Sequence, residues 1–222
     1  HLAGTDELGR DIFSRILYGG RVSLTIGIIS VGIGLLCGGS LGVLAAYYGG
    51  LAETAIMRII DILMAIPSII LSISICAALG SGIVNTMIAV GISSIPTYAR
   101  VFRSAVISEK SKEYIEASKA VGAGNARIIL RHILPNSLAP VIVQASLGVA
   151  QAITTAASLS FIGLGIQPPN PEWGALLSGG RQYIRDYPHM VVYPGIAIML
   201  TVLALNLIGD GLRDALDPRL KR

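Results

Sequence analysis

Four stretches of this chain contain no Asp, Glu, Lys or Arg, and they constrain the fold more than any other feature. They cover residues 22–46, 62–99, 133–171 and 187–209. Only 14% of the 222 residues are charged, whereas a soluble domain carries about 25%. A helix needs roughly 20 apolar residues to cross a bilayer core about 30 Å thick. The uncharged stretches therefore predict an integral membrane protein.

Two of these stretches are too long for a single span. Residues 79–82, Leu-Gly-Ser-Gly, are typical of a tight turn, and the other long stretch ends in GIQPPNP, whose prolines lack the backbone donor of a helix. The pattern also lacks the roughly ten-residue alternation of a membrane barrel. Because backbone groups in hydrocarbon must bond internally, the predicted fold class is all-α and polytopic. The five predicted spans lie near residues 20–46, 57–79, 83–106, 137–163 and 188–210.

Lysine and arginine are distributed unevenly between the two sides that these spans define. Twelve of the 17 fall on the side that holds segment 100–132, Arg58 and the C-terminal tail, and five fall on the other side, namely Arg10, Arg15, Arg21, Arg181 and Arg185. The positive-inside rule places the richer side in the cytoplasm. Residue 1 then lies outside, yet the chain begins with His1 and has no signal peptide. We therefore expect a six-helix parent whose first helix precedes residue 1, with 1–222 forming a single transmembrane domain.

The charged cytoplasmic loop 107–135 has the pattern of two short helices joined by a break. Ser108 can cap a first helix that runs to Val121, and two glycines follow. Asn125 can cap a second helix that stops at Pro135. Acidic and basic side chains interleave in this loop, which fits a protein groove better than an anionic membrane surface. An interfacial helix that rests on lipid headgroups is the alternative.

A gapped pattern in this loop consists of Glu116-Ala117-Ser118, then Gly122, then a closing His132-Ile-Leu-Pro135. It resembles the EAA loop of ABC importer permeases, with Ser118 in place of the second alanine and His132 in place of the usual isoleucine. Further stretches resemble the dipeptide/oligopeptide/nickel permease family, most closely its dipeptide-type second permease subunit. They are GTDELGRDIFSR (4–15), MRIIDILMAIPS (57–68), SFIGLGIQPPNPEWG (160–174) and LNLIGDGLRDALDPRL (205–220).

The resemblance implies a set of partners in a prokaryotic inner membrane. Cytoplasmic ATP-binding subunits would receive the coupling residues Glu116, Ala117, Ser118 and Gly122 in a surface groove. A homologous permease subunit would complete the path through the lipid, and an extracytoplasmic substrate-binding protein would meet the outer loop 164–187. The chain contains no G-x-x-x-x-G-K-[ST] sequence. We expect no cofactor in this chain, ATP-Mg in the partner ATPase, no catalytic residue and no nucleic acid.

Polar but uncharged side chains inside the predicted spans are candidates for lining the substrate path. They are Ser93, Ser94 and Thr97 on one span, and Gln144, Gln151, Thr155 and Ser158 on one face of another. Hydrogen bonding between helices explains such a stripe equally well. Every mid-span position is uncharged, which argues against a proton-coupled secondary transporter. The predicted cargo is a di- or oligopeptide, with nickel or another small ligand as the alternative within the same family.

Several smaller features have structural interpretations. The spacing of Gly34 and Gly38 predicts close helix packing, and the scattered cysteines and histidines give no metal-ligand spacing. Arg58 and Asp61, like Asp210 and Arg213, are expected to pair within their own helices at i, i+3. The outer loop presents Glu172, Trp173, Arg181, Arg185 and Asp186 either as an exposed docking surface or as an interfacial segment that Trp173 and Tyr187 anchor.

Overall fold

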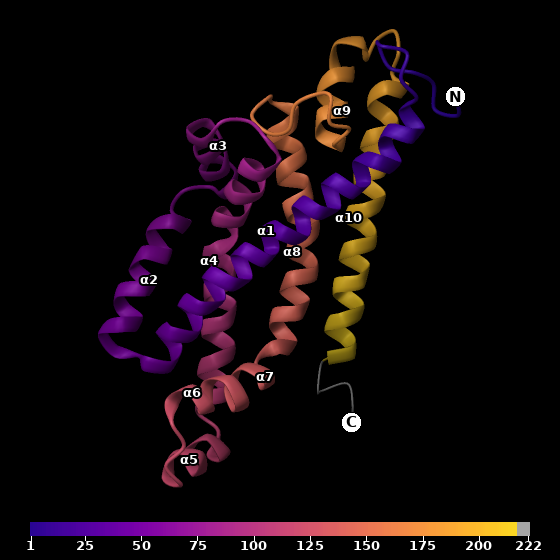
Figure 1. Cartoon of the computed structure of the whole chain (residues 1–222). Coiled ribbons are helices and arrows are strands. Elements are labelled where there is room, and N and C mark those ends of the chain that lie inside the picture. Colours follow the sequence, from indigo (N-terminus) through magenta and orange to yellow (C-terminus); the bar gives the residue numbers. More distant parts are fainter. Residues whose placement is uncertain (217–222) are drawn as a thin grey trace.

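The computed structural model describes residues 1–216, and its regular structure is helical. The all-α, multi-helix membrane fold predicted from the sequence is confirmed. The molecule is an elongated bundle, with the N-terminus and α9 at one end and α5 to α7 at the other (Figure 1). In chain order the helices are α1 (Ile12–Tyr48), α2 (Gly50–Met64), α3 (Ser68–Leu79), α4 (Ile83–Lys110), α5 (Glu113–Ala120), α6 (Asn125–Arg127), η1 (Ile128–Ile133), α7 (Leu134–Asn136), α8 (Leu138–Phe161), α9 (Trp173–Gly180), η2 (Arg181–Tyr183) and α10 (His189–Leu216).

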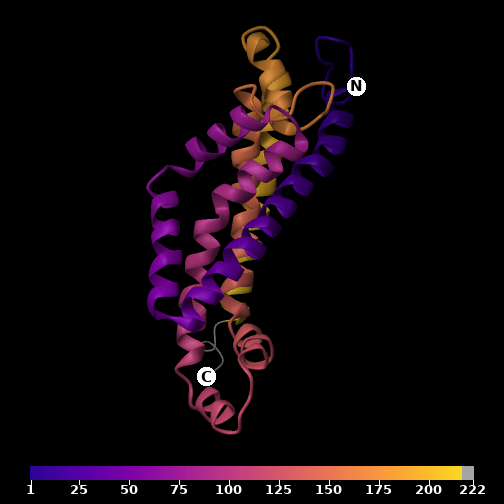
Figure 2. The same ribbon diagram turned by 60° about the vertical axis from the view of Figure 1, so that its left-hand side comes forward.

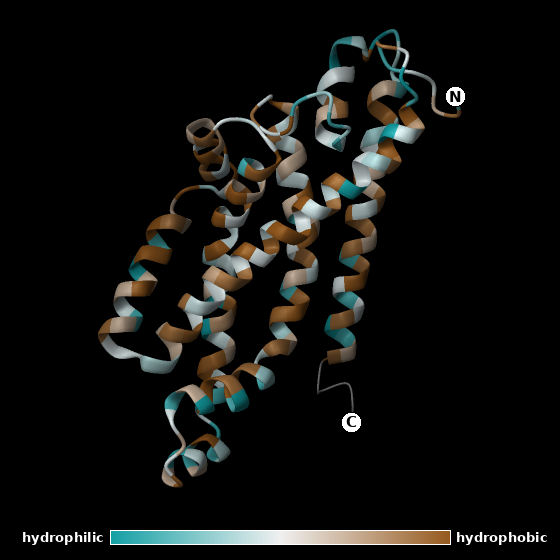
Figure 3. Ribbon diagram, viewed as in Figure 1, coloured by the Kyte–Doolittle hydropathy of each residue, from teal (hydrophilic) through white to brown (hydrophobic). Residues whose placement is uncertain are grey.

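Helices α1, α8 and α10 are long and apolar enough to cross a membrane. α4 has 28 residues and runs between the same two ends of the bundle (Figure 1). Apolar residues dominate the shafts of these helices, and hydrophilic residues gather at the two ends (Figure 3). The charged segment around α5 and the C-terminal end of α10 lie at one end, as the order of the predicted spans requires. Arg219, Lys221 and Arg222 lie outside the described residues.

The predicted span 57–79 is not a single straight helix. It is divided between α2 and α3, which are bent by 86° with respect to each other (Figure 2). Pro67 causes the break, because proline has no N–H to donate and disfavours helical geometry in the residue before it. The turn predicted at 79–82 is confirmed, with Gly80 and Gly82 both at positive φ.

The contact between α1 and α4 depends on small side chains. A Cβ at Gly38 would collide with the carbonyl oxygen of Ile95, and one at Gly42 would collide with that of Ala99. The two backbones therefore approach more closely than any larger residue would permit, which increases the van der Waals contact between the helices. The close packing predicted from the glycine spacing is confirmed.

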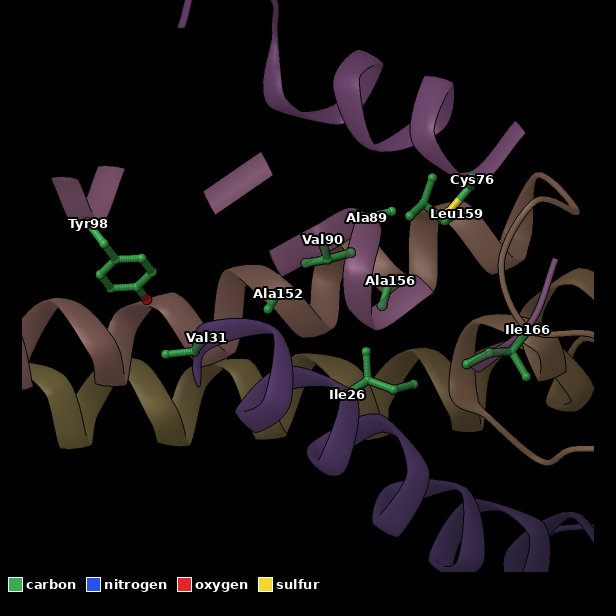
Figure 4. Close-up of a cluster of buried hydrophobic side chains, with 10 residues drawn as sticks. All are labelled: Ile26, Val31, Cys76, Ala89, Val90, Tyr98, Ala152, Ala156, Leu159 and Ile166. Carbon is green, nitrogen blue, oxygen red and sulfur yellow. The ribbon is translucent and has the colours of Figure 1, made fainter. Parts of the chain in front are cut away.

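The two larger clusters of buried apolar side chains fill most of the bundle. The first joins α1, α3, α4 and α8 and includes Cys76 (Figure 4). The second lies toward α5 and combines side chains from α1, α4, α5, η1 and α8, including Tyr47, Phe102 and Ile115. Both cysteines are free, and Cys37 is exposed.

The outer segment 164–187 differs from the predicted exposed surface. Glu172 is 1% exposed and Trp173 is 5% exposed, so neither forms a docking face or a membrane anchor. The Trp173 indole lies against Gly19 and Gly20, and its Nε1 donates a hydrogen bond to the carbonyl of Ile16 at 2.9 Å. These two glycines leave a notch on α1 that the ring fills. Arg181, Arg185, Asp186 and Tyr187 are exposed.

Candidate coupling surface and substrate path

Helix α5 ends in a Schellman motif centred on Gly122. The amide of Ala123 donates to the carbonyl of Ser118 at 3.1 Å, and the amide of Gly122 donates to that of Lys119 at 2.9 Å. Gly122 has φ 81°, a conformation that costs other L-residues free energy. The predicted helix break at this glycine is confirmed.

The predicted start of the first loop helix at Ser108 is wrong. α4 continues to Lys110, so Ser108 lies inside it, and α5 begins at Glu113 after Lys112. The reason is that the buried side of α4 extends beyond residue 106, where the predicted span ends: Glu109 is only 8% exposed. The helix therefore retains packing contacts up to its last turn.

The second loop helix also differs from its prediction. Gly124, and not Asn125, occupies the N-cap position of α6, because the Asn125 side chain accepts a hydrogen bond from the Tyr47 hydroxyl at 2.8 Å. Pro135 does not end the helical segment. It stands in the first turn of α7, where a helix does not use the N–H that proline lacks, and the π-helix η1 precedes it.

One face of α5 is attached to the bundle and the other is exposed. Ile115 is fully buried against a cluster that includes Ile128 and Ile133. Glu116 and Ala117 are exposed, and so is Gly122, beside which a Cβ would meet nothing within 4 Å. Val121, also at this tip, is 84% exposed although it is apolar.

Ser118 is the one predicted coupling residue that is half-buried. Its hydroxyl donates to the carbonyl of Tyr114 at 2.7 Å, so its hydrogen-bonding capacity is partly used within α5. The structure thus gathers Glu116, Ala117 and Gly122 on one accessible surface, with Ser118 at its edge. Their contact with an ATPase subunit stays a prediction.

A buried carboxylate connects α5 to the two helices beside it. Glu109, at the end of α4, accepts hydrogen bonds from Lys112 Nζ at 2.6 Å and from the Tyr114 hydroxyl at 2.7 Å. The Tyr114 hydroxyl also accepts a bond from Asn136 Nδ2 at 3.3 Å, which connects α5 to α7 and so to the start of α8. Burial alone would raise the pKa of Glu109, but these two hydrogen bonds outweigh it and hold that pKa below its usual value.

A second set of bonds fixes the end of α1 to the same region. Lys110 Nζ donates to the carbonyl of Tyr47 at 2.6 Å and to that of Ala46 at 3.2 Å. Both carbonyls belong to the last turn of α1, where no further helical amide can reach them. Sequence reasoning missed both residues. The partners of Lys110 are more than 60 residues away in the sequence, and Glu109 reaches Lys112 and Tyr114 only because the chain turns between α4 and α5.

A cavity of about 380 Å³ lies among α1, α3, α4, α8 and α10. Every lining residue is uncharged, and many carry a hydroxyl or an amide. Six of the seven predicted path residues line it; Ser158 does not, and its hydroxyl donates to the carbonyl of Thr154 at 2.8 Å. The lining comprises Val31, Ser68, Val90, Ser93, Ser94, Thr97, Tyr98, Gln144, Leu147, Gly148, Gln151, Ala152, Thr155 and Asn206.

Tyr98 and Asn206 are lining residues that sequence reasoning missed. Tyr98 is 2% exposed and extends from α4 toward α8, where its oxygen lies over Gly148 (Figure 4). Its hydroxyl has no hydrogen-bond partner among residues 1–216. Asn206 was recognisable as the one amide in the apolar run of α10, whereas the direction of Tyr98 depends on the α4–α8 contact.

A second hollow, of about 510 Å³, lies between α2 and α4 and is strongly charged. Arg100 Nη2 lies 2.6 Å from Asp61 Oδ1, and Arg103 Nε lies 2.7 Å from Glu53 Oε1. We call this hollow, lined by Glu53, Thr54, Met57, Arg58, Asp61, Arg100 and Arg103, the charged groove.

The predicted pairing of Arg58 with Asp61 is therefore wrong, because Asp61 faces α4 and takes Arg100 as its partner. Arg58 forms no ion pair within the part of the chain that the structure describes, and neither do Asp210 and Arg213. A prediction from i, i+3 spacing considers one helix only, and here a side chain from a neighbouring helix lies nearer.

Comparison with known proteins gives relatives that match almost the entire chain. This chain is 54% identical over 221 residues to a dipeptide transport system permease protein DppC of Alkalihalophilus pseudofirmus, and the match covers 100% of this chain and 73% of that protein. The chain is 52% identical to a glutathione transport system permease protein GsiD of Pectobacterium atrosepticum, with the same coverage. A di/tripeptide transport system permease protein DppC of Pseudomonas aeruginosa is 51% identical, over 99% of this chain and 73% of that protein.

Solved structures share the fold at much lower identity. A chain of the MetNI methionine ABC transporter, in an inward-facing conformation, superposes with a TM-score of 0.74 at 21% identity, over 91% of this chain and 96% of that chain. A chain of an amino acid ABC transporter gives a TM-score of 0.68 at 13% identity. The family model described as the binding-protein-dependent transport system inner membrane component matches residues 38–222. The chain belongs to this family and is a permease subunit of an ABC importer.

Proposed function

We propose that this permease conducts di- or oligopeptides across the cytoplasmic membrane of a prokaryote. The observation that carries the proposal is the neutral cavity among α1, α3, α4, α8 and α10. Its hydroxyl and amide groups offer both donors and acceptors to the repeated N–H and C=O groups of a peptide backbone. Two of the relatives are named for dipeptide or di/tripeptide transport.

The proposed partners occupy the two ends of the bundle and its side. Cytoplasmic ATP-binding subunits, which hold ATP-Mg, receive the tip of α5 formed by Glu116, Ala117, Ser118 and Gly122. An extracytoplasmic binding protein delivers the peptide at the end that carries α9. A homologous permease subunit faces the cavity from the other side and completes the path. The exposed apolar Val121 beside Gly122 supports a protein partner at the α5 tip, since an isolated apolar side chain there gains from burial.

Motion is proposed to pass from α5 to the cavity through the Glu109 network. ATP binding draws the ATPase subunits together and displaces α5. Glu109 and Tyr114 carry the displacement to α4, and Asn136 carries it to α8. Both helices line the cavity, so a tilt of either one changes its opening. Alternating access then follows from the ATPase cycle.

The nickel alternative is less well supported by the lining. None of the described side chains around the cavity is His, Cys or Met, the ligands that nickel and similar metals favour over hydroxyl and amide groups. Specificity within an importer also depends on its binding protein, so the two cargoes are distinguished by experiment.

Uptake by the full-length protein, reconstituted in liposomes with its companion subunits and binding protein, tests the cargo. We expect ATP-dependent uptake of labelled dialanine and none of radioactive Ni²⁺. Uptake of Ni²⁺ without uptake of any peptide would overturn the proposal.

Co-purification tests the coupling surface: Glu116→Arg should lose the ATPase subunits. Asp186→Arg, an equal charge change at the opposite end, should retain them. If Glu116→Arg retains the ATPase subunits and also transports peptide, α5 is not the coupling element.

A further inference from the structure

We propose that the charged groove between α2 and α4 is a second station on the substrate path, which binds the charged termini of a peptide before its release. The inference rests on the proposed peptide cargo. It concerns residues that the neutral cavity does not include, and it gives the groove a ligand class: a zwitterion that carries an ammonium and a carboxylate.

The groove and the cavity adjoin along one face of α4. Ser93, Thr97, Arg100 and Arg103 follow one another at intervals of four, three and three residues, which places them on the same side of the helix. The first two line the cavity, and the last two line the groove. On the opposite wall, Ser68 belongs to the cavity, whereas residues up to Asp61 belong to the groove. A molecule that leaves the cavity toward α5 therefore meets the groove next.

The two hollows differ in charge. The cavity offers only neutral groups, so neither terminus of a peptide finds a counter-charge there. The groove contains three guanidinium groups and two carboxylates. Arginine binds carboxylates through paired hydrogen bonds, and an aspartate or glutamate accepts hydrogen bonds from an ammonium. The groove is thus complementary to both ends of a peptide.

The existing ion pairs are accessible enough to exchange partners. The side chains of Arg100 and Asp61 are 49% and 48% exposed, and those of Arg103 and Glu53 are 38% and 26% exposed. Ion pairs exposed to this extent are weak, because water competes for both partners. An incoming carboxylate or ammonium can replace one member without leaving a buried charge behind.

Arg58 distinguishes the groove from a simple clamp between helices. It lines the hollow and is exposed, yet it forms no ion pair within residues 1–216. An ionisable group on a membrane helix that has no structural partner points to a functional site. Arg58 and Asp61 are separated by about 4.5 Å along α2, which is shorter than the roughly 7 Å of an extended dipeptide. Their flexible side chains make up the difference.

The competing interpretation is that the groove only holds α2 in place. α2 has a single buried residue, Ile60, so its two ion pairs to α4 are a substantial part of its attachment. If the groove only holds α2, each ion pair needs one charge of each sign, either helix can carry either sign, and Arg58 is not needed. If the groove binds a peptide, Arg58 is needed, and each charge must stay on its own helix. The two interpretations therefore predict different mutants.

The test measures uptake of labelled dialanine by the reconstituted full-length complex, together with ATPase activity and thermal stability. We expect Arg58→Gln to lower maximal uptake about tenfold, as loss of a charge-assisted hydrogen bond does, with unchanged stability and an unchanged KM for the loaded binding protein. Arg21→Gln, which removes an exposed arginine at the outer end of α1, is the matched control and should transport as the wild type does.

The exchange Asp61→Arg with Arg100→Asp separates the two interpretations. We expect the exchanged protein to regain the stability that either single change removes, while its uptake remains low. Full uptake by this protein, or by Arg58→Gln, overturns the station. Absence of dialanine uptake by the wild type would instead refute the proposed cargo, so the two failures are distinguishable.

Discussion

The hydroxyl of Tyr98 lies over the Cα of Gly148, so close that a Cβ at position 148 would overlap the phenolic oxygen. The ring comes from α4 and the glycine from α8, and both line the neutral cavity. The pair therefore determines how near these two helices stand at the level of the cavity.

Gly148→Ala should displace the Tyr98 ring into the cavity. Overpacking of this kind costs about 1–3 kcal/mol of stability, and we expect peptide uptake to fall further than ATPase activity does. The measurements are thermal unfolding in detergent and reconstituted uptake. Adding Tyr98→Phe removes the colliding oxygen and should restore part of the stability. If Gly148→Ala alone behaves as the wild type, the close contact is not maintained during transport.

Gly38→Ala should destabilise the α1–α4 contact. Its Cβ would meet the backbone carbonyl of Ile95, which cannot rotate away as a side chain can. We expect a loss of about 1–3 kcal/mol, seen as a lower midpoint of thermal unfolding. Gly32→Ala on the same helix is the control, since a Cβ there meets nothing within 4 Å. It should be neutral or slightly stabilising, and equal effects at the two positions would contradict the packing argument.

Gly122→Ala should weaken coupling without affecting the bundle. The positive φ at this residue costs an L-amino acid about 1–2 kcal/mol, so the last turn of α5 should fray. We expect reduced stimulation of the ATPase by the loaded binding protein, with unchanged thermal unfolding. Gly124→Ala is the matched control, because Gly124 has φ −68° and open space around it. A normal response from Gly122→Ala would show that the Schellman turn has no part in coupling.

Acidification should loosen α5 through Glu109. The pKa of this carboxyl is held below its ordinary value of 4.5 by Lys112 and Tyr114. The stability that it contributes is therefore complete above the ordinary pKa and disappears as the pH falls through the lower folded value. Hydrogen exchange of the α5 amides, followed from about pH 6 to pH 3 and corrected for the intrinsic exchange rate at each pH, should show a loss of protection in the wild type at the acid end.

The same exchange measurement on Glu109→Gln provides the comparison. Glutamine does not titrate, so this variant should lack the acid-induced change beyond that of the rest of the molecule. Glu113→Gln, which changes an exposed carboxyl on α5, should retain it. An identical acid response in all three proteins would exclude Glu109 as the titrating group.

The main features of the fold follow from one-dimensional patterns. Uncharged stretches and the Gly80–Gly82 turn predict most of the helical order, and the order of the spans predicts that α5 and the C-terminal end of α10 lie at the same end. The bend after α2 was also visible in principle, since Pro67 stands in the middle of the predicted span. Its 86° angle was not, because no local rule sets the direction in which the chain resumes.

The site residues show where local reasoning ends. The spacing of Gln144, Gln151 and Thr155, at intervals of seven and four residues, predicts that they share one helix face, and all three line the cavity. Tyr98 was not predicted, because its direction depends on the absence of a side chain at Gly148 in another helix. Trp173 was predicted to be exposed, since nothing in its own segment indicates the notch at Gly19 and Gly20. Contacts between distant segments decide each of these cases.

Helix α1 is held at both ends by contacts with other parts of the chain. At one end Lys110 binds the carbonyls of its last turn, and at the other the Trp173 indole binds the carbonyl of Ile16. The 37 residues between Ile12 and Tyr48 form one continuous helix, about 55 Å long. A displacement at either aqueous surface must therefore shift or bend this rod. The two surfaces are mechanically connected through this one helix, and because Val31 of α1 is part of the cavity wall, such a displacement also reaches the cavity.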